Sequence, residues 1–131
     1  MNSFHSPDTL ARPSGYVHAV RSTCRTTVLV SGQVAYEASG TIVGKGDLAA
    51  QTRQVYANIG KALEAAGASM QDLVKTTLYV VGLDPDKARL IREARAPFLK
   101  PGEPPASTMV GVASLAHPDL LLEVEAVAMF D

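Results

Sequence analysis

A long helical repeat set between two valine-rich strands constrains the fold of this chain more than any other feature. Asp47 is suited to cap the start of the helix, and Gly67 is suited to follow its end. The strand Thr26–Ala35 precedes this segment and the strand Val74–Val81 follows it. The residues that recur at helical spacing are Leu48, Gln51, Val55, Ile59, Ala62, Leu63 and Ala66.

The rest of the chain adds a second helix and further strands. Asp84 and Pro85 predict the start of the helix, and Pro97 predicts its end or a kink. Its residues Ala88, Ile91, Ala94 and Arg95 lie on one face. Further strands are predicted at Tyr16–Arg21, Ser107–Ala113 and Leu120–Phe130. The resulting order, β-β-α-β-α-β-β, predicts an α+β fold with a sheet of four to six strands and both helices on one face.

The length of 131 residues indicates a single domain spanning residues 1–131. Residues 1–15 are polar and contain Pro7, Pro13 and Gly15, so we expect a loosely ordered N-terminal arm. The second face of the sheet would be left apolar. Self-association is the simplest way to cover it.

Charge and motif content exclude several classes of function. The net charge is −1, and the basic residues are scattered apart from Arg89, Arg92 and Arg95, which argues against a nucleic-acid partner. No apolar run approaches the roughly 20 residues that span a bilayer, and the first 15 residues lack the apolar core of a signal peptide. With Cys24 as its single cysteine, the chain is expected in the cytoplasm. The three histidines lack metal-ligand spacing and no phosphate-binding glycine loop is present, so we expect neither a metal nor an organic cofactor.

The last strand carries the most suggestive residues for chemistry. Glu123 and Glu125 lie two apart within LLLEVEAVAMF, so they share one face of the strand. A carboxyl group among apolar neighbours suits general acid or base catalysis near neutral pH. The alternative is an edge strand with a solvated outer face.

Three other positions could contribute to a site. Ser107 and Thr108 stand at a strand entrance, where hydroxyl and backbone N–H groups could bind a carboxylate or carbonyl oxygen, or simply cap a turn. Ser31 precedes Gly32 in mid-strand, which indicates either a close approach by a ligand or another chain segment, or a structural bulge. Cys24 has no histidine or acid placed by the sequence to activate it and is interpreted as inert.

An ordered set of short motifs, running from about residue 11 to the end of the chain, resembles the RidA/YjgF family. The motifs are Ser14-Gly15-Tyr16, Val30-Ser31-Gly32-Gln33, Gln51 through Asn58-Ile59, Gly67, Asp72-Leu73-Val74-Lys75-Thr76-Thr77, Pro105-Ala106 and Glu123-Val124-Glu125-Ala126. The resemblance implies a chorismate-mutase-like α+β fold. It also implies a homotrimer with three ligand clefts between adjacent subunits, and no cofactor.

The resemblance further implies a chemistry and a set of site residues. Active members of this family hydrolyse reactive enamines and imines, such as 2-aminoacrylate, to 2-oxo acids and ammonia. Glu123 matches the carboxylate credited with positioning the attacking water, and Tyr16 and Ser31 match positions that line the cleft. The backbone N–H of Met109 matches a donor to the substrate, a small metabolite.

One position departs from the pattern of the deaminating members. They carry Pro-Ala-Arg, in which the arginine binds the substrate carboxylate, whereas this chain has Pro105-Ala106-Ser107. Losing one partner of a buried charge pair costs roughly 2–5 kcal/mol. Either Arg92, Arg95 or Lys100 replaces the missing cation, or the substrate is altered and lacks a carboxylate. We expect the second case, with Ser107 and Thr108 forming a more neutral site.

Two alternative functions are also considered. The chain could be a non-catalytic trimer that binds or senses a small metabolite in the same clefts. Some family names carry a ribonuclease label, but the near-neutral charge argues against cleavage of RNA.

Overall fold

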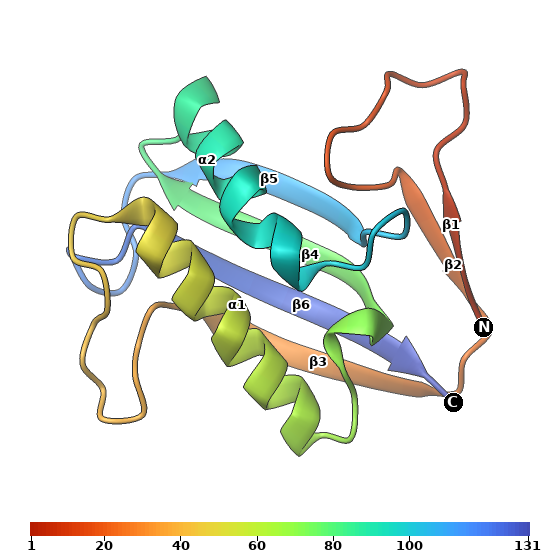
Figure 1. The fold of residues 1–131 in the computed structure, drawn as a ribbon, viewed down its shortest axis with the longest axis horizontal. Coiled ribbons are helices and arrows are strands. Elements are labelled where there is room, and N and C mark those ends of the chain that lie inside the picture. Colours follow the sequence, from red (N-terminus) through yellow and green to blue (C-terminus); the bar gives the residue numbers. More distant parts are fainter.

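The computed structural model describes residues 1–131 and arranges them around a four-stranded sheet with two helices on one face (Figure 1). The strands lie in the order β3-β6-β4-β5. Their bounds are Thr26–Gln33 for β3, Leu73–Val81 for β4, Ala106–Val112 for β5 and Leu122–Phe130 for β6. The helices are α1 (Leu48–Ala65) and α2 (Pro85–Arg95), and the short 3-10 turns are η1 (Met70–Asp72) and η2 (Ala96–Phe98).

A second sheet has two strands, β1 (Asn2–His5) and β2 (Ala19–Ser22), which makes six strands in total. The predicted α+β fold with two helices on one face of a mixed sheet is confirmed. β6 runs antiparallel to both β3 and β4, whereas β4 and β5 are parallel and are connected through α2. None of the helices is long and apolar enough to span a membrane.

Alternation along β6 divides the sheet into a helix-covered face and an open face. Leu122, Val124, Ala126 and Ala128 are buried under the helices, where they join Val55, Ile59 and Leu63 of α1 in the core. Glu123 and Glu125 lie on the opposite side, which we call the open face. The strand register adds to that face the residues Leu29, Lys75, Thr77, Tyr79, Thr108, Val110 and Val127. This face mixes apolar, acidic and basic residues, so it is less apolar than predicted.

Both helices begin and end as their capping residues predict. The Asp47 side chain accepts a hydrogen bond from the N–H of Ala50, and Gly67 follows the end of α1 with a φ of 78°. The Asp84 side chain accepts from the N–H of Lys87, and α2 ends at Arg95, two residues before Pro97.

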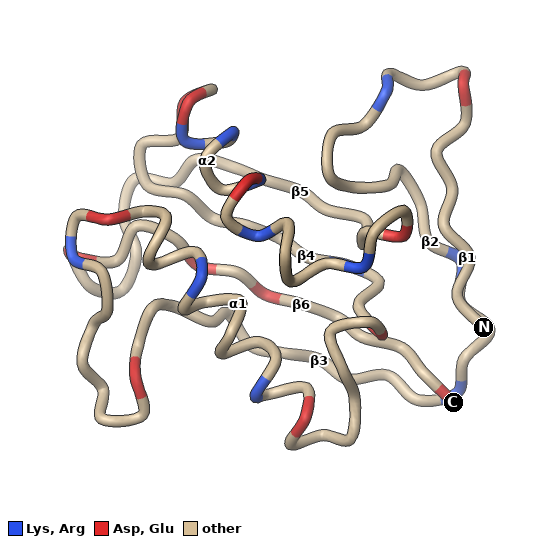
Figure 2. The backbone as a smooth tube through the Cα atoms, viewed as in Figure 1, with Lys and Arg blue, Asp and Glu red and all other residues tan.

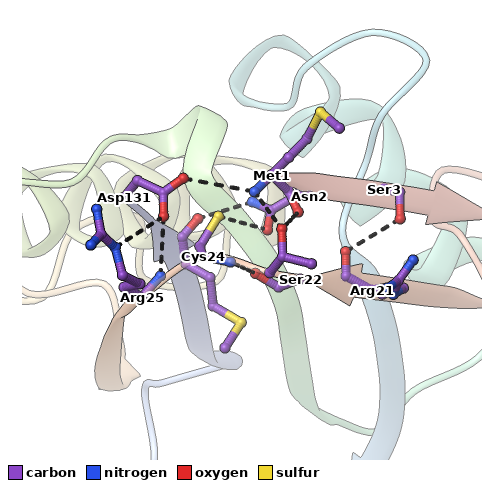
Figure 3. A network of polar contacts seen from close by, with 10 residues as sticks. Met1, Asn2, Ser3, Arg21, Ser22, Cys24, Arg25 and Asp131 are labelled. Atoms are coloured by element: carbon purple, nitrogen blue, oxygen red, sulfur yellow. Dashed lines mark hydrogen bonds and ion pairs between the residues drawn. The ribbon is translucent and has the colours of Figure 1, made fainter.

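The predicted loose order of residues 1–15 is wrong for the first few residues. Asn2–His5 forms β1, which pairs with β2, and the Asn2 side chain donates a hydrogen bond to the carbonyl oxygen of Met129 at 2.9 Å. Figure 3 shows this corner, where Cys24 contacts Asn2 and the N–H of Arg25 donates to Asp131. The pairing joins residues 14 or more positions apart, so the local pattern of residues 1–15 did not indicate it.

Two polar residues of α1 hold the loops that lead into the sheet. The buried Gln51 donates to the carbonyl oxygens of Gly44 and Asp119 and accepts from the N–H of Leu121. The Asn58 side chain donates to the carbonyl oxygens of Val34 and Tyr36. Gln51 therefore fixes the entry of β6, and with it the placement of Glu123.

Candidate functional site

The sequence-predicted site residues fall into two groups on opposite faces of the sheet. Ser107 is paired with Thr76 of β4, and the buried side chain of Thr76 lies on the face of the sheet that the helices cover. Glu123 is paired with Tyr79 on the open face. Within one copy of the chain, the sheet therefore separates Glu123 from Ser107.

The first group lines a cavity of about 390 Å³ beside α2. Tyr16, Ser107 and Met109, which the family resemblance assigns to the ligand cleft, all line this cavity. The remaining lining residues are Arg12, Ser14, Arg92 and Arg95. We call this space the α2 cavity; its volume is in the range that holds a small metabolite.

Arg95 forms the most enclosed part of the α2 cavity. Its side chain is 3% exposed, and its Nη2 donates to the carbonyl oxygen of Gly15 at 3.2 Å. Gly15 has a φ of 75°, and a Cβ added there would lie 3.3 Å from that Nη2. Glycine therefore lets the segment before β2 pass closely over Arg95.

A buried tyrosine lies next to Arg95 on the core side. Tyr56 is fully buried, and its Oη has no hydrogen-bond partner. Burial raises the pKa of Tyr56, and Arg95 opposes that rise, first through its positive charge and then as a nearby donor whose geometry falls short of a hydrogen bond to Oη. Inside the protein, Arg95 therefore neighbours the uncharged phenol of Tyr56, which does not neutralise the guanidinium charge.

Ser107 has one defined partner in the α2 cavity. Its Oγ accepts a hydrogen bond from Oγ1 of Thr76 at 2.9 Å, which leaves the O–H of Ser107 available as a donor. Arg92 and Arg95 line the same cavity, whereas Lys100 is paired with Glu103 and lies outside the lining set. Of the three cations considered for the missing arginine, two therefore line the same cavity as Ser107.

The backbone of β5 also presents donors toward this cavity. β5 is an edge strand, and the carbonyl oxygen of Pro105 accepts from Val17 on the edge away from β4. Because N–H and C=O groups of alternate residues point to the same edge of a strand, the N–H groups of Ser107 and Met109 point to that edge too. The parallel bridge between Val17 and Ala106 directs the N–H of Ser107 at the carbonyl oxygen of Val17, so the N–H of Met109 is the donor left open. No strand pairs with β5 there beyond the single bridge between Val17 and Ala106.

Thr108 is separated from Ser107, although the sequence analysis grouped them. Adjacent strand residues face opposite sides, and the Thr108 Oγ1 accepts from Lys75 Nζ at 2.8 Å on the open face. Thr108 thus lies outside the α2 cavity.

The second group is built around Glu123 and the bulge in β3. The β3–β6 register shifts between Val30 and Gln33, which confirms the bulge predicted at Ser31-Gly32. A Cβ added at Gly32 would lie 2.8 Å from Cδ of Glu123, so the carboxyl group occupies the space that a side chain would take. Ser31 lies beside it and lines a shallow depression of the open face.

Glu125 has a different environment from Glu123. Tyr79 Oη donates a hydrogen bond to Oε1 of Glu125 at 2.6 Å. This hydrogen bond is the main cause that raises the pKa of Tyr79, with a smaller contribution from the charge of Glu123. The carboxylate of Glu125 thus accepts a hydrogen bond from a tyrosine, whereas the carboxylate of Glu123 has no side-chain hydrogen-bond partner.

Two features of the site were missed by sequence reasoning. Arg12 and Ser14 reach the α2 cavity from an irregular segment, in which no periodic pattern indicates direction. The burial of Arg95 did have a signal, because its helical spacing places it on the same face as Ile91. No group of three histidine, cysteine, aspartate or glutamate side chains lies close enough to hold a metal ion.

Comparison with known proteins identifies a family that matches this chain. The family described as endoribonuclease L-PSP matches residues 7–130. A RutC family protein of Pyrococcus horikoshii is 37% identical over 101 residues, which cover 77% of each chain. A RutC family protein of Synechocystis is 30% identical over 78% of this chain and 77% of its own.

Solved structures agree with the sequence relatives. A Rid-family protein of unknown function, YyfB from Yersinia pestis, is 39% identical, with a TM-score of 0.93 and 98% of each chain covered. The Escherichia coli protein TdcF, solved with bound serine, is 28% identical, with a TM-score of 0.70, over 92% of this chain and 91% of its own.

Proposed function

Since the chain belongs to the endoribonuclease L-PSP family, the RidA/YjgF family of the sequence analysis, we propose that it hydrolyses the C=N group of a small metabolite in a cleft shared by two copies of the chain. The observation that carries the proposal is the division of the site residues. Ser107 and Met109 open to one side of the sheet and Glu123 to the other, so they can meet only if a second copy supplies one half.

Exposed apolar side chains on the open face support the shared cleft. Leu29 is 77% exposed and Val110 is 39% exposed, and both lie on the face that carries Glu123. Covering them with another copy of the chain would bury apolar area, and each Å² buried contributes about 25 cal/mol. A homotrimer with three such clefts is the assembly that the family resemblance suggests.

The proposed reaction assigns one role to each group. A water molecule held by the Glu123 carboxylate adds its oxygen to the imine carbon, and its proton passes to Glu123. That proton is then delivered to the nitrogen, which gives a carbinolamine. The hydroxyl proton of the carbinolamine next passes through Glu123 to the nitrogen as the C–N bond breaks, so ammonia leaves a carbonyl product. The N–H of Met109 donates to the substrate from the partner half, and Tyr16 and Ser31 shape the cleft.

The substrate expected from the cavity differs from the one expected from the sequence. Replacement of the family arginine by Ser107 suggested a ligand without a carboxylate. Arg92 and Arg95 stand in the same cavity as Ser107, and their guanidinium groups are suited to bidentate binding of a carboxylate. We therefore favour a substrate with an anionic group next to its C=N bond.

Hydrolysis of 2-aminoacrylate generated in the assay, followed as release of the 2-oxo acid, tests the proposal. Glu123→Gln removes the proton acceptor and is expected to lower the rate by about 10²- to 10⁴-fold. Glu125→Gln is the matched control, because that carboxylate is bound by Tyr79, and it is expected to stay within a few-fold of wild type. Full activity of Glu123→Gln on a confirmed substrate would show that the catalytic assignment is wrong.

A non-catalytic metabolite-binding trimer is the second candidate. The observation that favours it is the uncharged Ser107 at the position where deaminating members hold the substrate. Ligand binding by purified protein without turnover of any enamine or imine would select this function.

RNA cleavage, the activity in the family's name, has less support. Figure 2 shows that the Lys and Arg positions along the backbone are distributed over separate elements, and the net charge is −1.

A further inference from the structure

The α2 cavity holds positive charge that no acidic residue neutralises. Arg12, Arg92 and Arg95 line it together, and none of them has a carboxylate of the same copy of the chain within 4.0 Å. The chain has 13 acidic residues, so their absence here is a matter of placement rather than supply.

The burial of Arg95 makes this imbalance costly. A guanidinium carries five N–H donors, and Arg95 makes one hydrogen bond, to Gly15. Its position in the last turn of α2 gives partial compensation, because the helix C-terminus carries about half a negative charge. Arg92 lies in the same turn and shares that compensation. Most of the positive charge therefore remains for a ligand to neutralise.

Neutral donors surround the three arginines. Ser14, Tyr16 and Ser107 bring hydroxyl groups to the cavity, and the O–H of Ser107 is free to donate because its oxygen accepts from Thr76. Hydroxyl and guanidinium donors without a neighbouring acid form a site for anionic oxygens.

We propose that the ligand of the α2 cavity is a small dianion, a molecule that carries either two carboxylates or one phosphate group. A single carboxylate paired with the buried Arg95 would leave the guanidinium groups of Arg12 and Arg92 in the same cavity without a counter-charge, and a second negative charge could pair with one of them. This inference deepens the proposed function, on which it rests for the reacting C=N group. The substrate class is then an imine or enamine with two negative charges, such as that formed when an amino dicarboxylate is oxidised at its α-carbon.

Binding of unreactive probes to the intact protein tests this directly. Titration calorimetry at constant ionic strength compares succinate and inorganic phosphate with propionate, a monocarboxylate of similar shape. At least one dianion is expected to bind roughly ten- to hundredfold more tightly than propionate, the gain from one or more additional charged hydrogen bonds. The succinate and phosphate arms distinguish a dicarboxylate from a phosphate ligand. Equal affinity for all three probes, or no binding of either dianion, overturns the proposal.

Variants on α2 localise the binding. Arg92→Gln is expected to weaken the preferred dianion about tenfold or more and to change propionate binding less. Arg89→Gln is the matched control on the same helix, since Arg89 is paired with Asp86 and lies outside the cavity; its affinity should equal that of wild type. Arg12→Gln, on an exposed segment, repeats the test without disturbing the core. Unchanged dianion binding in both Arg92→Gln and Arg12→Gln overturns the proposal.

The two proposals fail in different ways. Glu123→Gln removes a carboxylate that the shared cleft would bring near the ligand from a second copy, so this variant should bind the dianion at least as tightly as wild type while losing turnover. Dianion binding without turnover of any C=N compound would refute the proposed hydrolase function and support the proposed dianion site. Turnover of 2-aminoacrylate with no preference for dianions would refute the proposed dianion site and support the proposed hydrolase function.

Discussion

The α2 cavity and the open face around Glu123 differ in charge and in enclosure. The cavity collects three arginines under the segment that crosses Gly15, whereas the open face carries two glutamates in an exposed strand row. A C=N hydrolase needs a site that binds an anion and a carboxylate that handles a proton. For the hydrolysis proposed above, each region would supply one of these, so neither would be a complete active site alone.

The largest expected effect comes from mixing two impaired variants, assayed at a substrate concentration low enough that weak binding by Arg92→Gln limits its rate. Glu123→Gln damages the open face and Arg92→Gln damages the cavity. If each cleft takes one half from each of two copies, about one cleft in four of a randomly mixed assembly has both halves intact. Co-expression should therefore restore roughly a quarter of wild-type activity, measured as ammonia release.

Separately purified variants mixed without subunit exchange serve as the control for that experiment. Mixed assemblies that form, as shown by mass spectrometry, yet stay inactive would mean that both halves belong to one copy.

Gly32→Ala sharpens the description of the open face. The new Cβ would fall 2.8 Å from Cδ of Glu123 and displace its carboxyl group. A displacement of about 1 Å can cost on the order of tenfold to a hundredfold in kcat, which an enamine hydrolysis assay would measure. Gly60→Ala, in a helix where the nearest side-chain atom would be 3.7 Å away, should leave kcat unchanged. A fully active Gly32→Ala protein would refute the tight placement of Glu123.

Gly15→Ala examines how the cavity is closed. Its φ of 75° disfavours alanine by about 1–2 kcal/mol, and the added Cβ meets Arg95. Gly40→Ala is the control, with a φ of 83° and no atom within 4 Å. Urea unfolding at fixed protein concentration should show a larger loss of stability for Gly15→Ala, and calorimetry should show weaker dianion binding for that variant alone. Identical losses in both assays would mean that the contact with Arg95 is unimportant.

The smallest effect is a shift in the titration of Tyr79. Its pKa is raised because the neutral phenol donates to Glu125, so deprotonation breaks that hydrogen bond. The stabilisation is present below the ordinary tyrosine pKa of about 10 and is lost as the pH rises through the higher folded value. Difference absorbance in the near ultraviolet should show Tyr79 titrating at lower pH in Glu125→Gln than in wild type. Superimposable titrations would mean that Glu125 does not hold the phenol.

Much of the fold and part of the site could be predicted from the sequence. The caps at Asp47 and Asp84, the shared face of Glu123 and Glu125, and the bulge at Gly32 all follow from local rules of helix and strand geometry. The same alternation would have separated Ser107 from Thr108, which were grouped because both are hydroxyl residues at a strand entrance.

The rest depends on contacts between distant segments. Pairing of β1 with β2 and the path of residues 6–15 bring Arg12 to α2, and nothing within that segment encodes the destination. The count of unneutralised arginines likewise emerges only when every acidic residue has been placed in space. The net charge of the whole chain is close to zero, whereas the α2 cavity is lined by three arginines and by no acidic residue.

The position of β6 has a consequence for how the chain is made. This strand lies between β3 and β4, yet it is the last of the three to leave the ribosome. Until residues 122–130 emerge, β3 and β4 have no partner on their inner edges, and each exposes a row of unpaired backbone groups. Synthesis of the nascent chain therefore passes through a state prone to strand exchange, and closure of the sheet waits for the segment that also carries Glu123.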